Sequence, residues 1–377
     1  MTKVHGIVRV AALALAGAAL GAACGSGSEG TSASGLTPEN LLAAALSPAD
    51  IEELFDEPES WWPFFPEFNV GVGFNPLASE GESKASFFIV QRYGRVAGPD
   101  EGEVQTALSL YDDEAAAEQG FRDATEINDE GSKEVEGPAI ADQRRYFTRK
   151  AEDDSGAPPL EATVRFRVGR VMGRLTVFSE RSYESPETLA EYAEPMVGRI
   201  QELLEGSFSA DPIPKEIAEL LPSDSAAEPA GEIFGSAVRP AQSWALIDTS
   251  GDPEEVLGKL QGFGVSELGL RRYGLEADAS NVIEVVLFPM EDEDGAQEWV
   301  HEFSGAAEEA GTLDAGDTGE HSAFGSFDET IYELQFAKGR FAADVSCFAP
   351  FEEKPSSACE ESVRKLAEAW YEELPEG

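Results

Sequence analysis

The sequence predicts an α+β protein made of two tandem copies of one unit, each an antiparallel sheet that is packed by helices and ends in an amphipathic helix. Three observations lead to this fold class. A short pattern repeats, because Phe166–Arg170 and Phe336–Arg340 both read as a strand, a glycine turn and the start of a second strand. Residues 186–204 and 357–374 carry apolar side chains at three- and four-residue intervals, as amphipathic helices do. Apolar and polar residues alternate from residue 164 to 168, which indicates a sheet with one buried face.

Residues 1–23 have the features of a secretory leader. Lys3 and Arg9 precede an apolar stretch that is too short to span a bilayer as a helix. The segment closes on Leu-Gly-Ala-Ala before Cys24, and this ending resembles the lipobox of bacterial lipoproteins. The resemblance implies cleavage before Cys24, attachment of lipid (palmitate) to that cysteine, and an anchor on the extracytoplasmic face of the cell membrane. The alternative is an ordinary cleaved leader, which would leave Cys24 as a free thiol or remove it.

Glycine and serine dominate the residues that follow the leader, so 24–36 is expected to be a flexible tether. The remaining chain is long enough for two domains that each bury a core. The segment Gly206–Pro214 carries two serines and two prolines and is the expected boundary. The predicted division is therefore a first α+β repeat at 37–206 and a second at 207–377.

The remaining elements follow the same order in both copies. Each copy opens on a helical segment, at Pro38–Phe55 and at Pro214–Leu221. A strand that ends in Tyr-Gly comes next, at 93–94 in the first copy and at 273–274 in the second. An apolar strand and an acidic helix start follow, at 107–111 and 112–114 in the first copy and at 282–288 and 291–294 in the second.

Cys347 and Cys359 are the two cysteines that remain after Cys24. In an oxidising exterior, a pair at this spacing most simply forms a disulfide. The corresponding positions of the first copy are Val177 and Leu189, which are both apolar. We therefore expect the strand and the closing helix to touch in both copies, through a disulfide in the second and an apolar contact in the first.

Aromatic residues concentrate in one segment near the start of the first copy. Trp61, Trp62, Phe64 and Phe65 lie within six residues that also hold two prolines. One use of such a segment is packing over the first sheet. The other is contact with a sugar, a lipid or a protein, to which rigid aromatic side chains are suited. Both uses stay open at the level of the sequence.

Basic residues concentrate in the first copy although the protein is acidic. Eight of the 27 lysines and arginines lie within residues 144–174. Arg165 and Arg167 alternate with apolar residues, so both are expected on the sheet face opposite the core. With Arg144 and Arg145 they form a candidate site for an anionic ligand or an acidic protein partner. The alternative is pairing with the chain's own carboxylates, because exposed ion pairs are weak indicators of function.

The composition argues against several function classes. With 73 acidic and 27 basic residues, the net charge of −46 disfavours nucleic acid as a partner, because phosphate binding needs clustered Lys and Arg. The three histidines are His5 in the leader, His301 and His321, so the first copy has none for a Ser-His-Asp or Cys-His arrangement. His321 and three nearby carboxylates could hold a divalent cation, but solvated loop charges are the preferred interpretation. No cofactor and no metal site are predicted.

The tandem layout resembles the repeated α+β extracellular domains of actinobacterial envelope lipoproteins and the PsbP-like and sensor-type domains. The resemblance covers most of residues 37–375 and depends on the order of elements and on the glycine-turn hairpin. It implies binding or sensing and carries over no catalytic residue. The predicted function is a lipid-anchored, non-catalytic binding or sensing protein of the cell envelope. The alternatives are a carboxylate-dependent hydrolase that acts on envelope polymers and a passive structural surface lipoprotein.

Overall fold

The computed structural model describes most of the chain after the tether. The leader, Cys24 and nearly all of the tether lie outside the described residues, so the lipidation of Cys24 stays a prediction. The described residues are 36–70, 85–96, 102–126, 132–150, 160–211, 213–248, 252–275, 281–327, 331–348 and 357–376.

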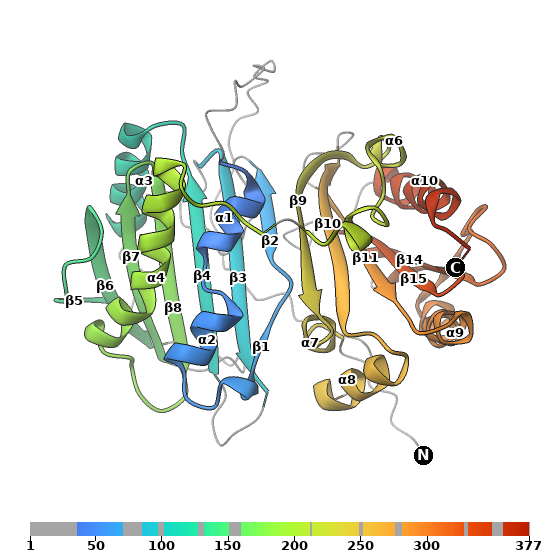
Figure 1. The fold of residues 1–377 in the computed structure, drawn as a ribbon, viewed down its shortest axis with the longest axis horizontal. Helices are drawn as coiled ribbons and strands as arrows, with labels where there is room; N and C mark the ends of the chain where they lie inside the picture. The colour runs from blue at the N-terminus through green and yellow to red at the C-terminus, as the bar shows by residue number, and fades with distance from the viewer. Residues whose placement is uncertain are drawn as a thin grey trace.

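Within these ranges, the first half of the chain forms an eight-stranded antiparallel sheet (Figure 1). The strand order is β1-β3-β4-β8-β7-β6-β5, and β2 also pairs with β3. Helices α1, α2 and α4 pack on one face, whereas α3 packs on the other. The elements are α1 (Pro38–Ala44), α2 (Pro48–Leu54), β1 (Trp61–Pro63), β2 (Glu67–Val70), β3 (Phe87–Arg95), β4 (Gly102–Leu110), α3 (Glu114–Glu126), β5 (Lys133–Val135), β6 (Gln143–Lys150), β7 (Leu160–Val168), β8 (Val171–Ser179) and α4 (Pro186–Glu205).

The second half forms a seven-stranded antiparallel sheet, counted over the same described ranges. Its order is β12-β13-β14-β15-β11-β10-β9, with α10 on one face and α9 on the other. The elements are α5 (Lys215–Ala218), α6 (Asp224–Ala227), β9 (Gly231–Pro240), α7 (Gln242–Ala245), α8 (Pro253–Gly262), β10 (Glu267–Leu275), β11 (Val282–Pro289), α9 (Glu293–Ala310), β12 (Thr312–Leu313), β13 (Ser322–Phe327), β14 (Ile331–Lys338), β15 (Phe341–Phe348) and α10 (Ser357–Glu373).

The two sheets have the same topology. Starting from the side where the two halves meet, the strands of the first sheet run β3-β4-β8-β7-β6-β5. They correspond in order to β10-β11-β15-β14-β13-β12 of the second sheet. Helix α3 follows β4 as α9 follows β11, and each sheet ends in a long helix, α4 or α10. The α+β fold class, with two tandem copies of an antiparallel sheet and a closing helix, is confirmed.

A two-residue glycine turn joins the central hairpin of each sheet. Gly169 lies between β7 and β8, and Gly339 lies between β14 and β15; both have a φ of 53°. A side chain in this left-handed conformation collides with the backbone, so glycine is the residue that adopts it at least cost. The repeated Val-Gly-Arg and Lys-Gly-Arg sequences therefore mark the same hairpin.

The opening helices differ from the expected single segments. Residues 38–55 form two helices, because Ser47 caps a new helix through a reciprocal hydrogen-bond pair with Asp50, and Pro48 has no N–H to continue the first helix. The expected helix at 214–221 is only the short α5. No helix in the described ranges is long and apolar enough to cross a membrane.

One hydrophobic cluster continues from the first sheet into the second. Strands β2 and β9 lie side by side where the halves meet (Figure 1). Phe68 of β2 is fully buried and occupies the space where a side chain at Gly235 of β9 would lie. Nearby, Nη2 of Arg239 donates a 2.8 Å hydrogen bond to Oε1 of Gln91. The two halves therefore share a packed and hydrogen-bonded junction.

Candidate functional site

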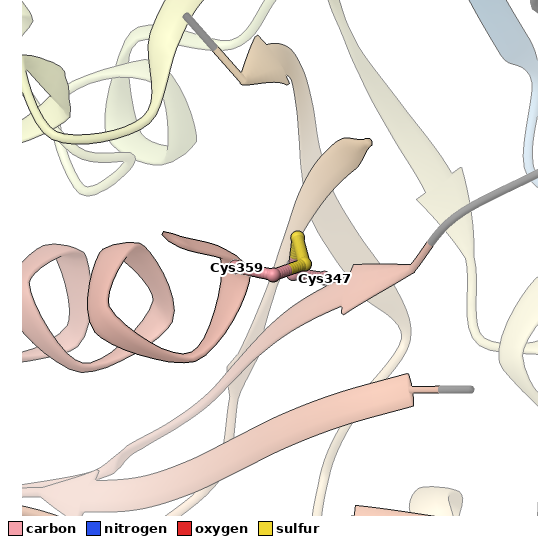
Figure 2. Close-up of a disulfide and its surroundings, with 2 residues drawn as sticks. All are labelled: Cys347 and Cys359. Atoms are coloured by element: carbon pink, nitrogen blue, oxygen red, sulfur yellow. A yellow bond between two sulfur atoms is a disulfide. The ribbon is translucent and has the colours of Figure 1, made fainter. Parts of the chain in front are cut away.

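Cys347 and Cys359 form a disulfide, as their spacing predicts (Figure 2). The bond joins β15 to the start of α10, with the two Cα atoms 5.8 Å apart. Both cysteines are fully buried among apolar side chains of the second sheet. The disulfide therefore lies in the core of the second half and is a structural crosslink.

The corresponding positions of the first half are also buried. Val177 of β8 and Leu189 of α4 belong to the same hydrophobic cluster and are 5% and 1% exposed. The strand and the closing helix of both halves are thus packed together at this end. Two buried apolar residues occupy, in the first half, the positions that the disulfide cysteines occupy in the second.

The aromatic segment is part of the junction between the halves. Trp62 and Phe65 are buried in the shared cluster, and the Phe65 ring lies 6.2 Å from the ring of Trp244 in the second half. Trp244 in turn contacts Phe288 edge-on at 4.8 Å. For Trp62 and Phe65 the geometry therefore favours the core-packing interpretation over contact with an external ligand.

The other two aromatic residues are half-buried and contact the chain's own arginines. The guanidinium of Arg92 lies 4.6 Å from the centre of the Phe64 ring, and that of Arg95 lies 6.0 Å from Trp61. Trp61 also packs against Phe55 of the region after α2, at 5.2 Å. These contacts hold the segment against β3.

Three arginines form a straight row across three neighbouring strands of the first sheet, β6, β7 and β8. Arg145 of β6 lies directly opposite Arg165 of β7, and Arg165 lies directly opposite Arg174 of β8. Directly opposite residues on neighbouring strands share a face and are about 5 Å apart. We call these three residues the arginine row; it lies on the face that α3 covers.

The end of α3 lies over this row. Arg165 donates a hydrogen bond to the carbonyl oxygen of Ala124, and Arg145 donates to that of Thr125 at 3.4 Å. The carbonyl end of a helix carries partial negative charge, so it attracts guanidinium groups. Arg174 is 7% exposed and donates from Nη2 to Oε1 of Gln105 at 3.2 Å. The face opposite the core is therefore partly covered and not simply a solvent-facing surface.

The four basic residues predicted as one site lie in different places in the structure. Arg145 and Arg165 belong to the row. Arg167 lies two residues further along β7 on the same face, where its Nε donates a 2.8 Å hydrogen bond to Oε1 of Gln143 and its guanidinium lies 3.6 Å from the Asp142 carboxylate. Arg144 lies opposite Phe166, on the other face, and donates to the carbonyl of Pro138. Four arginines close in sequence thus do not form one site.

Three polar residues that the sequence did not single out lie beside the arginine row, on the same face of the sheet. Thr163 and Thr176 lie directly opposite each other, with their hydroxyl oxygens 2.9 Å apart, and both are buried. Gln105 lies opposite Thr176 on β4. Strand β4 is far from β7 and β8 in the chain, so only the pairing of β4 with β8 brings Gln105 beside the arginines.

The remaining candidates show no assembled site in the described part of the chain. His301 and His321 are both exposed. The groups near His321 do not form a metal cluster, since no three His, Cys, Asp or Glu side chains come together to hold an ion within the described ranges. A depression of about 250 Å³ lies between α5 and the start of β10, with Ile217, Glu267 and Arg340 among its lining residues.

No protein-family model matches the chain. No curated protein matches it. Among solved structures, the chain is similar to the extracellular domain of PknH from Mycobacterium tuberculosis, with 10% sequence identity and a TM-score of 0.33. The similarity covers 45% of this chain and 98% of that domain. The functional proposal for this chain therefore depends on its own residues.

Proposed function

We propose that this protein is a lipid-anchored binding protein of the cell envelope, and that the arginine row of the first sheet binds an oxyanion on its ligand. The ligand group is a phosphate or a carboxylate, which guanidinium groups bind through paired N–H donors. The observation that carries the proposal is the alignment of Arg145, Arg165 and Arg174 on three neighbouring strands.

The envelope location is supported by the sequence and by the disulfide. The leader and the lipobox-like ending before Cys24 are typical of an exported, lipid-bearing protein. A disulfide in the core, between Cys347 and Cys359, fits an oxidising compartment outside the cytoplasm. The proposed anchor is lipid on Cys24, followed by the 24–36 tether.

The fold itself does not require the arginine row. Like charges that lie directly opposite each other on neighbouring strands repel and destabilise a sheet. In the second sheet, the same three register positions hold Ala323, Gln335 and Asp344. The first sheet therefore retains three arginines where the same fold forms without any. An anion between them offsets the repulsion, and the carbonyl end of α3 offsets part of it.

The alternative role of the arginine row is structural: it holds helix α3 against the sheet. Arg145 and Arg165 both donate to carbonyl oxygens at the end of that helix. The contact of Arg165 to the helix is lost in an Arg165 variant whether or not the row also binds a ligand. Stability alone therefore cannot separate the two roles, and the informative measurement is ligand-dependent.

The test compares Arg165→Gln with the unchanged full chain. Gln is the residue at the equivalent position of the second sheet, so the substitution is compatible with the fold. Inorganic phosphate should raise the melting temperature of the unchanged chain at constant ionic strength, by mass action. Arg165→Gln should lower the baseline, because α3 loses a contact, and should remove most of the phosphate-dependent rise.

The matched control is Lys215→Gln, which removes a charge from a side chain that is 79% exposed and distant in sequence. It should keep the full phosphate-dependent rise. An equal rise in all three proteins would assign the row to α3 docking and would contradict the proposed ligand site. A passive surface role would then be the better description.

A further inference from the structure

The depression beside α5 lies where the first half of the fold has a buried aromatic side chain. The strand segments Phe87–Gly94 and Glu267–Gly274 occupy the same place in the two sheets, and both end in Arg-Tyr-Gly. Phe87 is 8% exposed and belongs to the shared core, whereas Glu267, at the equivalent position, is exposed. The side chain that fills this place in the first half is therefore missing from the second.

A glycine and a short helix shape the rest of the depression. Ile89 of the first sheet is fully buried, and the equivalent residue of the second sheet is Gly269. A side chain at Gly269 would lie 2.7 Å from the side chain of Ile217, so the glycine lets α5 approach the sheet closely. Helix α5 has four residues, whereas α1 and α2 have seven each. The shorter cover leaves a depression of about 250 Å³ beside it, which we call the α5 depression.

Apolar and charged side chains line the α5 depression together. The apolar lining includes Ile217, Leu220 and Pro289, and the charged lining residues are Glu216, Glu267 and Arg340. The volume is smaller than the roughly 300 Å³ at which sites for drug-sized ligands begin. It suits a ligand as small as one amino acid.

Glu267 and Arg340 have opposite charges but do not pair with each other. Neither side chain forms an ion pair with any residue that the structure describes, and both are exposed. Nη1 of Arg340 donates a 3.5 Å hydrogen bond to the carbonyl oxygen of Met290, and the guanidinium lies 5.2 Å from the Phe341 ring. No carboxylate of the described chain therefore competes with a ligand for Arg340.

The sheet keeps these two residues apart. Glu267 begins β10 and is level with Pro289, the last residue of β11, in the antiparallel pairing of these strands. Pro289 lies directly opposite Phe341 of β15, the residue that follows Arg340. Two strand spacings, or about 10 Å, therefore separate the backbones of Glu267 and Arg340. A small ligand over Pro289 lies between a carboxylate and a guanidinium.

We infer that the α5 depression binds a free amino acid with an apolar side chain. The carboxylate of the ligand pairs with Arg340 and its ammonium group with Glu267, so each charge of the zwitterion has one partner. Its side chain packs against Ile217 and Leu220, at the place that the ring of Phe87 occupies in the first half. This site is separate from the proposed oxyanion site, because it lies in the other half of the chain and takes a different ligand.

The test is calorimetric titration of the full chain with L-phenylalanine, at constant ionic strength and without phosphate. Three comparison ligands each lack one group: N-acetyl-L-phenylalanine has no ammonium, L-phenylalanine amide has no carboxylate, and glycine has no side chain. L-phenylalanine should bind, and each comparison ligand should bind at least about fivefold more weakly. Equal binding of the acetylated ligand or of the amide would assign the depression to a peptide end and would overturn the inference.

Three variants locate the binding. Arg340→Gln should weaken L-phenylalanine binding at least about fivefold and should bind L-phenylalanine and its amide equally, because the partner of the carboxylate is gone. Glu267→Gln should have an effect of the same size and should no longer distinguish L-phenylalanine from its acetylated form. Glu267→Phe places the side chain of the first half in the depression and should abolish binding. If Glu267→Phe fails to fold, the two Gln variants decide.

The matched controls are Arg170→Gln and Glu255→Gln. Arg170 follows the glycine of the central turn in the first half, as Arg340 does in the second, and Glu255 is an exposed carboxylate of α8. Both variants should bind L-phenylalanine as the unchanged protein does. The inference is wrong if L-phenylalanine does not bind, or if binding is unchanged in the folded Glu267 and Arg340 variants. The phosphate experiment depends on the arginine row and not on these residues, so the two proposals stand or fall separately.

Discussion

The ring of Phe65, in the segment between β1 and β2, packs 6.2 Å from the ring of Trp244, which belongs to the second half of the chain. The two residues are far apart in the sequence and meet where the sheets adjoin. Trp244 also contacts Phe288 and Trp299, so the cluster reaches the face of the second sheet that α9 covers. The stability of one half is therefore coupled to that of the other.

Replacing Trp244 by Ala should destabilise the whole protein by about 3 to 5 kcal/mol, because a large buried side chain is lost and a cavity remains. Unfolding in urea, followed by far-UV circular dichroism, measures the change. Tyr183→Ala is the control, since that ring is 42% exposed and its loss should cost less than 1 kcal/mol. Equal changes in the two variants would show that Trp244 does not join the halves.

The disulfide can be replaced by the apolar pair of the first half. The double variant Cys347→Val and Cys359→Leu should lose about 3 kcal/mol of stability, the value expected for crosslinking a loop of this length. Dithiothreitol should lower the stability of the unchanged protein toward that of the variant and should leave the variant unaffected. A variant as stable as the oxidised protein would mean that apolar packing alone is sufficient here.

An ion pair between Asp50 and Arg199 should make the first half sensitive to acid. Two hydrogen bonds of 2.8 and 3.0 Å connect the carboxylate of α2 to the guanidinium of α4. Burial raises the pKa of Asp50, but hydrogen bonds from Arg199 and Ser47 lower it more, so the net pKa lies below its usual 3.8. The stabilisation is therefore present above that value and is lost as the pH falls through the lowered pKa.

Asp50→Asn should cost about 3 kcal/mol at pH 7, because the largely buried carboxylate is lost and the partly buried guanidinium of Arg199 loses its charged partner. The difference from the unchanged protein should shrink as the pH falls below about 3.8, where the carboxylate becomes protonated. Urea unfolding across this pH range measures both effects. Glu52→Gln, on the exposed side of the same helix, should show neither; a pH-independent cost for Asp50→Asn would contradict the ion-pair explanation.

Glu103 should have the opposite effect on stability. Burial raises its pKa above 4.5; Arg92 lowers it and Glu67 raises it further. An acid whose folded-state pKa is raised destabilises the fold once the pH exceeds its usual pKa, because the folded protein holds a proton that the unfolded chain has released. Glu103→Gln should therefore raise the melting temperature at pH 7 and have little effect near pH 4.

The control for Glu103 is its neighbour Glu67, which lies 3.2 Å from Arg92. Glu67→Gln should lower the melting temperature at pH 7 or leave it unchanged, because it removes a favourable pair from a partly exposed site. Melting temperatures of both variants between pH 4 and 8 test the sign. A rise in both would indicate general relief of acidic repulsion and not burial of Glu103.

Much of the fold could be predicted because it is encoded locally. Gly169 and Gly339 mark the same turn, and the apolar periods of α4 and α10 place a closing helix after each sheet. The break between α1 and α2 was missed, although Ser47, Pro48 and Asp50 carry its signal as a capping box. The division into domains at 206 and 207 stays a prediction, because the hydrophobic cluster continues across the junction.

The candidate site could be predicted only in part. The concentration of basic residues near Arg145 and Arg165 is visible in the sequence, but their alignment with Arg174 depends on the register of β6, β7 and β8. A shift of one residue in that register would send the side chains to the other face. The match of Asp344 in the second sheet to Arg174 in the first depends on strand register in the same way, and carboxylates are too frequent in this chain for it to stand out.

The sequence by itself determined the duplicated α+β unit, the glycine turns, the closing helices and the pair of cysteines that form the disulfide, because each depends on a period, a turn residue or a spacing within a short stretch. Only the tertiary structure decided that Phe65 packs on Trp244, that three arginines form one row, and that Asp344 takes the place of Arg174 in the second sheet. These relationships depend on strand register and on contacts between distant segments, which the hydrophobic core and the sheet hydrogen bonds establish together as the chain folds.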